Sequence, residues 1–160
     1  MPTKSEDVAQ KIQFSIDDIG KLLKLEQILL QRSGFYDEIP TSIVELKGLT
    51  TVDLSQNNLT VVLPSRIGSS FKKLVTFDAS QNNLFGSYPN GICESTGLTS
   101  LSLHTNNFEG ILTNTSVANC VNLERLELQN NGFHGDFPTN LWSLPKIKVG
   151  FRVKSLILYQ

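Results

Sequence analysis

An internal repeat constrains this chain more than any other feature of its sequence. Copies begin at Leu25, Leu49, Leu74, Leu98 and Leu123, so successive copies are 24 or 25 residues apart. Apolar residues recur three, five and ten positions into the copies, and residues 55–59 are identical to residues 80–84. Self-similarity at a fixed period of roughly 20–50 residues is the signature of a solenoid. Each copy is therefore predicted to form one coil.

Each coil is predicted to begin with a short strand. Leu98 and Leu101 are three residues apart, and Leu101 and Leu103 are two apart. The step of two is the alternation of a strand, in which successive side chains lie on opposite faces. Because every copy restarts the same strand, stacked copies predict a parallel sheet with one strand per 24–25-residue coil. The rest of each copy must turn and return, in irregular or 3-10 arcs.

A recurring Asn at the eighth position is predicted to hold the coils together. A sharp turn leaves backbone N–H and C=O groups inside the coil, and these groups need partners. A buried Asn amide supplies two donors and an acceptor, so it can bond its own turn and a neighbouring coil. The predicted structural ladder consists of Asn57, Asn82, Asn106 and Asn131.

The repeats do not extend to either end of the sequence. We divide the chain into a polar segment, 1–15, a repeat region, 16–148, and a divergent tail, 149–160. The repeat region opens with a part-repeat, 16–24, followed by the repeats that start at residues 25, 49, 74, 98 and 123. The first 13 residues contain no apolar run of the kind found in secretory signals. We expect a fragment of a longer protein; the alternative is that residues 1–24 and 145–160 are divergent caps.

The repeat consensus resembles a known family. The run L-x-x-L-x-L-x-x-N-x-L-x-G-x-[IFLY]-P is similar to the plant-specific leucine-rich repeat, and residues 35–50, 102–110 and 128–148 resemble the ectodomains of plant leucine-rich repeat receptor-like kinases. The resemblance implies an α/β-type leucine-rich repeat solenoid, a curved right-handed superhelix with a concave parallel sheet. It also implies a location at the extracellular face of the plasma membrane, whereas a chain expressed as given, without signal or span, would stay intracellular. The kinase domain that accompanies such ectodomains is not in this sequence.

The strand residues between the inward apolar positions are predicted to project from the concave face. Equal offsets form rows, because neighbouring strands lie ~4.8 Å apart. These rows are polar, small and irregular, which suits an extended peptide or a protein loop; the alternative is that they are merely solvated. The candidate ligand-binding residues are Gln27, Thr51, Asp53, Thr76, Asp78, Ser100, Ser102, His104, Arg125 and Glu127.

Two cysteines and two glycosylation sequons leave alternatives open. Cys93 and Cys120 lie on the return arcs of neighbouring coils, so a disulfide is compatible with the spacing. Free buried thiols are the favoured interpretation, because Cys is among the most buried residue types. Asn58 and Asn114 each begin an Asn-x-Ser/Thr triplet and are candidate N-glycosylation sites if the chain enters the secretory route.

The sequence favours recognition over catalysis. A net charge of -1 gives no reason to expect nucleic acid, and no apolar run is long enough for direct membrane insertion. No metal-ligand cluster or cofactor motif is present, and Ser80, His104 and Asp78 fall on a strand ladder that offers no oxyanion hole. We expect a non-catalytic module, part of a plant receptor-like kinase or receptor-like protein ectodomain in cell-surface signalling. Its expected partners are a peptide or protein ligand and a co-receptor. The alternatives are a cell-wall hydrolase inhibitor of the leucine-rich repeat type and a truncated product without independent function.

Overall fold

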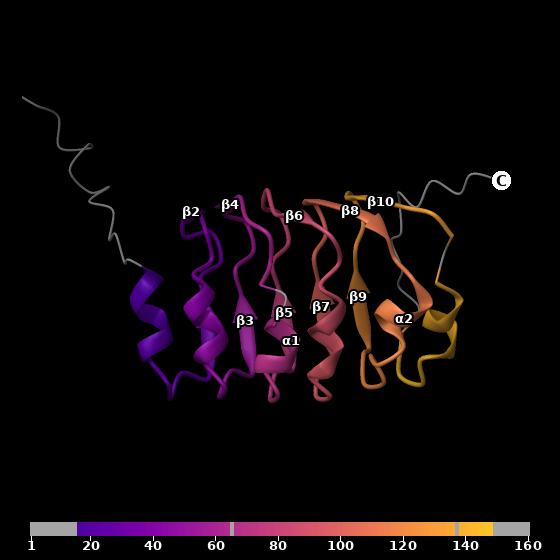
Figure 1. The fold of residues 1–160 in the computed structure, drawn as a ribbon, viewed down its shortest axis with the longest axis horizontal. Coiled ribbons are helices and arrows are strands. Elements are labelled where there is room, and N and C mark those ends of the chain that lie inside the picture. The colour runs from indigo at the N-terminus through magenta and orange to yellow at the C-terminus, as the bar shows by residue number, and fades with distance from the viewer. Residues whose placement is uncertain (1–15, 65, 137, 149–160) are drawn as a thin grey trace, which may run out of the picture.

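The computed structural model describes residues 16–148 except residues 65 and 137 (Figure 1). The predicted polar segment, 1–15, and the predicted tail, 149–160, lie outside the described residues.

Five short strands stack into one parallel sheet along the long axis of the molecule (Figure 1). They pair in sequence order, and residues at equal repeat offsets face each other, as Val52 faces both Ile28 and Phe77. The central residue of every strand is buried, so each coil contributes one side chain from this sheet to the core. The predicted parallel sheet, to which each coil contributes one strand, is confirmed. The strands are β1 (Gln27–Leu29), β3 (Thr51–Asp53), β5 (Thr76–Asp78), β7 (Ser100–Ser102) and β9 (Arg125–Glu127).

A second set of strands, which we did not predict from the sequence, follows the eighth position of each copy, which is Ser33 in the first copy and Asn in the others. One parallel pair joins β2 to β4, and a parallel sheet of three strands joins β6, β8 and β10. A bridge between Val62 and Phe85 connects the two groups. Alternate residues point inward, since Leu59 and Phe108 are buried between exposed neighbours. The strands are β2 (Tyr36–Asp37), β4 (Asn58–Leu59), β6 (Phe85–Gly86), β8 (Asn107–Ile111) and β10 (Gly132–His134).

Each return arc contains a short helix of four to six residues. Where a Pro is present, it precedes the turn and its carbonyl accepts the first helical bond, as Pro40 does from Ile43 at 3.0 Å. In the arc at residues 113–117, which lacks Pro, Thr113 caps the helix through a capping box with Ser116. The 3-10 turns are η1 (Ile16–Lys21), η2 (Thr41–Glu45), η3 (Asn90–Glu94) and η4 (Thr139–Ser143); the α-helical turns are α1 (Ile67–Ser70) and α2 (Asn114–Val117).

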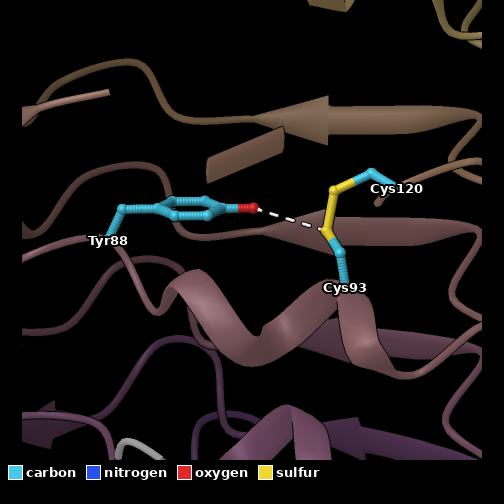
Figure 2. The surroundings of a disulfide bond; sticks show 3 residues. All are labelled: Tyr88, Cys93 and Cys120. Carbon is cyan, nitrogen blue, oxygen red and sulfur yellow. Dashed lines mark hydrogen bonds between the residues drawn. A yellow bond between two sulfur atoms is a disulfide. The ribbon is translucent and has the colours of Figure 1, made fainter. Parts of the chain in front are cut away.

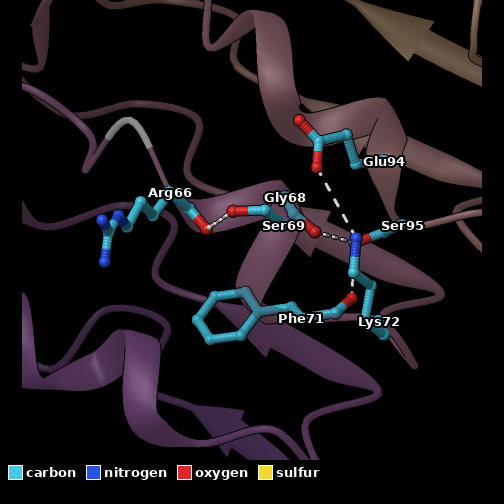
Figure 3. Close-up of polar contacts among 7 residues, drawn as sticks. All are labelled: Arg66, Gly68, Ser69, Phe71, Lys72, Glu94 and Ser95. Atoms are coloured by element: carbon cyan, nitrogen blue, oxygen red, sulfur yellow. Dashed lines mark hydrogen bonds and ion pairs between the residues drawn. The ribbon is translucent and has the colours of Figure 1, made fainter.

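Two of these arcs approach each other closely at Gly68 (Figure 3). A Cβ atom at Gly68 would lie 1.5 Å from the backbone carbonyl oxygen of Gly91 in the next arc. The hydroxyl of Ser95 joins the same two arcs, because it donates to the carbonyls of Gly68, at 3.1 Å, and Phe71. Only a residue without a side chain fits at position 68.

We expect Gly68→Ala to lower the free energy of unfolding by about 1–3 kcal/mol, because the added methyl group forces two backbones apart. Urea denaturation followed by circular dichroism measures the change. Ser69→Ala is the matched control: its half-buried hydroxyl donates one bond, 3.0 Å long, to the Arg66 carbonyl, and it should lose no more than about 0.5 kcal/mol. Equal losses in the two variants would contradict the close approach.

The prediction that Cys93 and Cys120 are free thiols is wrong. They form a disulfide between η3 and the end of the arc that contains α2, with Cα atoms 4.8 Å apart (Figure 2). The stacking of neighbouring arcs brings the two offsets together and buries both residues. The Tyr88 hydroxyl lies 3.8 Å from the sulfur of Cys93. Burial raises the pKa of Tyr88 well above its ordinary value, so this hydroxyl stays protonated at neutral pH.

Candidate ligand-binding face

The outward residues of β1, β3, β5, β7 and β9 form in-register rows, and we call this surface the strand face. Thr76 faces Thr51 on one side and Ser100 on the other, and Asp78 likewise faces Asp53 and Ser102. The ladder continues past the strands, because the backbone N–H of Gln81 donates to the carbonyl of His104 at 2.9 Å. The structure therefore brings the predicted residues together as neighbours on one surface.

The predicted residues differ in how accessible they are. Gln27 and Arg125 are exposed, and Ser102 is only 4% exposed. The Ser102 hydroxyl donates to a carboxylate oxygen of Glu127 at 3.1 Å, so Ser102 positions that carboxylate instead of facing a ligand. The other predicted residues are partly exposed: Thr51, Asp53, Thr76, Asp78, Ser100, His104 and Glu127.

Two neighbouring carboxylates give the strand face its chemical character. One oxygen of Asp53 accepts from the backbone N–H of Ser55 at 2.9 Å and from its hydroxyl at 2.7 Å. One oxygen of Asp78 accepts from the backbone N–H of Ser80 at 2.9 Å. Neither carboxylate forms an ion pair with any residue that the structure describes. The second oxygen of each carboxylate is therefore open to a ligand.

The two ends of the strand face differ. At the β9 end, Arg125 pairs with Glu127 at 3.2 Å, so that carboxylate is partly neutralised. At the β1 end, Leu29 occupies the same row as Asp53 and is 63% exposed. A ligand that crosses the face from one end to the other meets an apolar side chain, then two open carboxylates, then an ion pair.

The turn after each strand of the main sheet requires a residue in the left-handed backbone conformation. Sequence analysis did not predict this requirement. The φ angle is 54° at Arg32, 58° at Gln56, 54° at Gln81, 56° at Thr105 and 57° at Asn130. Residues other than Gly are uncommon in this region, and of these five only Asn130 is of a type that is enriched there. The position of these residues in the repeat could have indicated this conformation, because a sharp turn must precede the ladder Asn in every coil.

The predicted Asn ladder joins each coil to the one before it. The Asn82 side-chain oxygen accepts from the backbone N–H of Leu59 at 3.0 Å, and its amide donates to the carbonyl of Leu54 at 2.9 Å. Asn57 makes equivalent contacts with the preceding coil at Phe35 and Leu30, and its oxygen also accepts from the backbone N–H of Ser33. Asn106 and Asn131 repeat this arrangement one and two coils further on. These bonds fix the turns at the edge of the strand face.

The remaining predicted residues lie away from the strand face. Asn58 is exposed on β4, and Asn114 is the exposed first residue of α2. Ser80 is 2% exposed, which leaves its hydroxyl inaccessible to a substrate beside His104. Within residues 16–148, outside the two gaps, no cluster of His, Cys, Asp and Glu could hold a metal ion. None of the helices in that range is long and apolar enough to cross a bilayer.

Comparison with known proteins assigns the repeat. The family model for the Leucine Rich Repeat matches residues 48–70 and 122–144. A search of curated proteins finds no match. The chain is thus a leucine-rich repeat solenoid.

Solved structures of plant receptors are similar to this solenoid. The leucine-rich repeat ectodomain of the membrane receptor kinase GASSHO1/SCHENGEN3 from Arabidopsis thaliana, in complex with CASPARIAN STRIP INTEGRITY FACTOR 2, is 31% identical, with a TM-score of 0.77 over 82% of this chain and 16% of that one. The plant peptide hormone receptor RGFR1 in complex with RGF2 is 30% identical, with a TM-score of 0.75 over 82% of this chain and 20% of that one. A chain of the BIR3–SERK2 complex from Arabidopsis thaliana is 33% identical, with a TM-score of 0.68 over 74% and 62% of the two chains.

These matches carry the assignment one step further. The chain is a leucine-rich repeat protein similar to the ectodomains of plant receptor kinases. It spans 16% and 20% of the two larger receptor chains that it matches.

Proposed function

We propose that the chain is a non-catalytic recognition module, part of the ectodomain of a plant receptor-like kinase or receptor-like protein, and that its strand face binds a peptide or protein ligand. The observation that carries this proposal is the in-register display of accessible polar side chains on a ladder fixed by buried Asn residues. A rigid display loses little conformational entropy on binding. Two of the similar ectodomains were solved as complexes, one of them a peptide hormone receptor.

The ligand is expected to be extended and to carry a cationic side chain. Five strands spaced ~4.8 Å apart span about 20 Å, the length of roughly six extended residues. The open carboxylates of Asp53 and Asp78 lie near the middle of that span and favour a Lys or Arg. An apolar ligand residue next to that Lys or Arg would cover Leu29.

The proposed setting is the extracellular face of the plasma membrane, with a co-receptor as the second partner. The disulfide between Cys93 and Cys120 supports this setting, because disulfides persist in oxidising compartments. One similar structure is itself a complex of two proteins, BIR3 and SERK2.

A peptide-binding measurement tests the proposal. We expect synthetic peptides of about ten residues with a central Lys or Arg to bind the full chain more tightly than versions with a neutral residue there. Replacing both carboxylates, in Asp53→Asn with Asp78→Asn, should weaken binding of the basic peptides about tenfold or more, because a charge-assisted contact is lost. Isothermal titration calorimetry measures both affinities.

A control that removes a single carboxylate lies on the other set of strands. Glu109→Gln removes a carboxylate from the exposed side of β8 and should leave peptide binding unchanged. If Glu109→Gln weakened binding as much as the Asp pair, the ligand would not be on the strand face. Equal affinity for basic and neutral peptides would contradict the proposed role of Asp53 and Asp78.

A further inference from the structure

The sequence contains two Asn-Gly pairs, and the structure places them in opposite environments. Asn90-Gly91 lies at the start of η3, whereas Asn131-Gly132 joins the last Asn of the ladder to β10. In such a pair, the backbone nitrogen of the Gly can attack the carbon of the Asn side-chain amide, because the Gly has no Cβ atom to crowd the approach. The attack requires that the Asn side chain be free to turn and that the Gly N–H be accessible to a base. The fold therefore determines which pair reacts.

Asn131 is held in an unreactive arrangement. Its side-chain oxygen accepts from the N–H of Phe108 at 3.0 Å, and its nitrogen donates to the carbonyls of Leu103 and Leu128, both at 3.0 Å. Gly132 belongs to β10, which is paired with β8. The Asn131 amide can turn toward the Gly132 nitrogen only after these bonds break, so its reaction requires local unfolding.

Asn90 has none of these restraints. Its side chain is exposed and forms no hydrogen bond with any residue that the structure describes. The backbone N–H of Gly91 likewise donates to no group in the described part of the chain, because the first N–H groups of a helix lack partners within it. The N–H of the following residue, Ile92, already donates to the carbonyl of Pro89 at 2.8 Å. Gly91 is partly exposed, so both reacting groups are accessible in the folded chain.

We propose that Asn90 is a site of spontaneous deamidation, which converts it to isoaspartate and aspartate. The nitrogen of Gly91 forms a bond to Cγ of Asn90, the bond from Cγ to Nδ2 breaks, and ammonia leaves with the proton that the Gly91 nitrogen gives up. The product is a five-membered succinimide ring. Water then adds to either ring carbonyl and the bond from that carbon to the ring nitrogen breaks, which yields isoaspartate or aspartate. Water is the only co-reactant, and the inference is independent of the proposed function.

Isoaspartate lengthens the backbone where two arcs are in close contact. In this product the chain runs through the side-chain carbon, which adds one backbone atom, about 1.5 Å, before Gly91. The carbonyl oxygen of Gly91 is the atom that leaves no room for a side chain at Gly68 of the preceding arc. The added atom also lies between Tyr88 and Cys93, where the Tyr88 hydroxyl is 3.8 Å from a sulfur fixed by the disulfide (Figure 2). Isoaspartate therefore displaces these contacts, whereas aspartate leaves the backbone unchanged.

The first test compares the two pairs within one molecule. The full chain, with its disulfide intact, is incubated at neutral pH, and peptide mapping by mass spectrometry measures the loss of each side-chain amide. Asn90 should react at least about tenfold faster than Asn131, because the ladder bonds of Asn131 must open first. In reduced protein unfolded in urea, the two rates should agree within about twofold, since both pairs are then equally accessible.

Asn90→Gln is the matched control for the reacting side chain. It keeps an amide at this position but would have to form a larger ring, so reaction there should stop while the rate at Asn131 stays unchanged. Equal rates at Asn90 and Asn131 in the folded chain would overturn the inference. The same ratio of rates in folded and unfolded protein would also overturn it, because the local sequence would then set the difference.

The second test measures the effect of the longer backbone. An isoaspartate-specific methyltransferase, supplied with labelled S-adenosylmethionine, quantifies isoaspartate in the incubated protein, and thermal unfolding measures the midpoint, Tm. The fraction that contains isoaspartate should unfold about 2–4 °C below the fresh protein. Asn90→Asp, which has the new charge without the longer backbone, should match the fresh protein, and incubated Asn90→Gln should keep its Tm. An unchanged Tm in protein rich in isoaspartate, or an equal loss in Asn90→Asp, would contradict the proposed displacement of the arcs.

Discussion

Asn82→Ala is expected to lower the free energy of unfolding by about 2–4 kcal/mol, because it leaves the buried N–H of Leu59 without a partner and removes one bond from each of three backbone carbonyls. The Asn82 oxygen accepts from Leu59, and the amide donates to the carbonyls of Leu54, Ala79 and Ser80 at 2.9, 3.2 and 3.2 Å. Asn82 is only 8% exposed, so water does not replace these bonds. The orphaned N–H of Leu59 costs about 1–3 kcal/mol, and the lost bonds to the carbonyls cost less, because Asn57, Asn106 and the backbone of Gln56 still donate to those carbonyls.

The neighbouring asparagine provides the control. Asn83 is exposed and makes one side-chain bond, to Asn58, so Asn83→Ala should change stability by no more than about 0.5 kcal/mol. Urea denaturation compares the two variants, and hydrogen exchange should show a large loss of protection at the Leu59 amide only in Asn82→Ala. Equal stability of the two variants would mean that the ladder does not hold the coils together.

Removal of the disulfide is expected to have an effect of similar size and to lower the free energy of unfolding by about 3.5 kcal/mol. The bridge joins residues 27 apart in sequence, and a loop of that length in the unfolded chain gives this value from loop-closure entropy. The double variant Cys93→Ala with Cys120→Ala and the wild type under strong reductant should therefore unfold at similarly lowered urea concentrations.

Two controls isolate the bridge. Reductant should not change the urea concentration at which the double variant unfolds. Thiol titration of unfolded, unreduced wild-type protein should find neither Cys93 nor Cys120 free. Free thiols at these residues in oxidised protein would contradict the disulfide. A double variant as stable as the wild type would show that the arcs hold each other without it.

The main sheet was predictable because its signal repeats. Positions such as Val52, Phe77 and Leu101 are apolar in every coil, and a parallel stack is the arrangement that buries all of them. The second set of strands was missed because most of its members are two or three residues long and carry Gly at points such as Gly86 and Gly132. Such segments carry too few alternating residues to stand out from a turn.

The candidate site was predictable to the level of rows but not of individual side chains. Strand register follows from the repeat period, so the neighbours of Asp78 could be predicted. The burial of Ser102 could not, because it depends on how the longer Glu127 side chain of the next coil folds over it. The pairing of Cys93 with Cys120 likewise depends on how far one arc slides along the next, which the period alone does not determine.

The direction of the bonds between coils has a mechanical consequence. The ladders and the Asn bonds run along the stacking axis of the molecule (Figure 1), so a pull on the two ends loads every interface in series. A stack loaded in this way separates at its weakest interface, one coil at a time. The covalent link from Cys93 to Cys120 crosses one interface and exempts it from this separation. Under tension, coils would therefore peel away from either end toward a clamped pair that stays together.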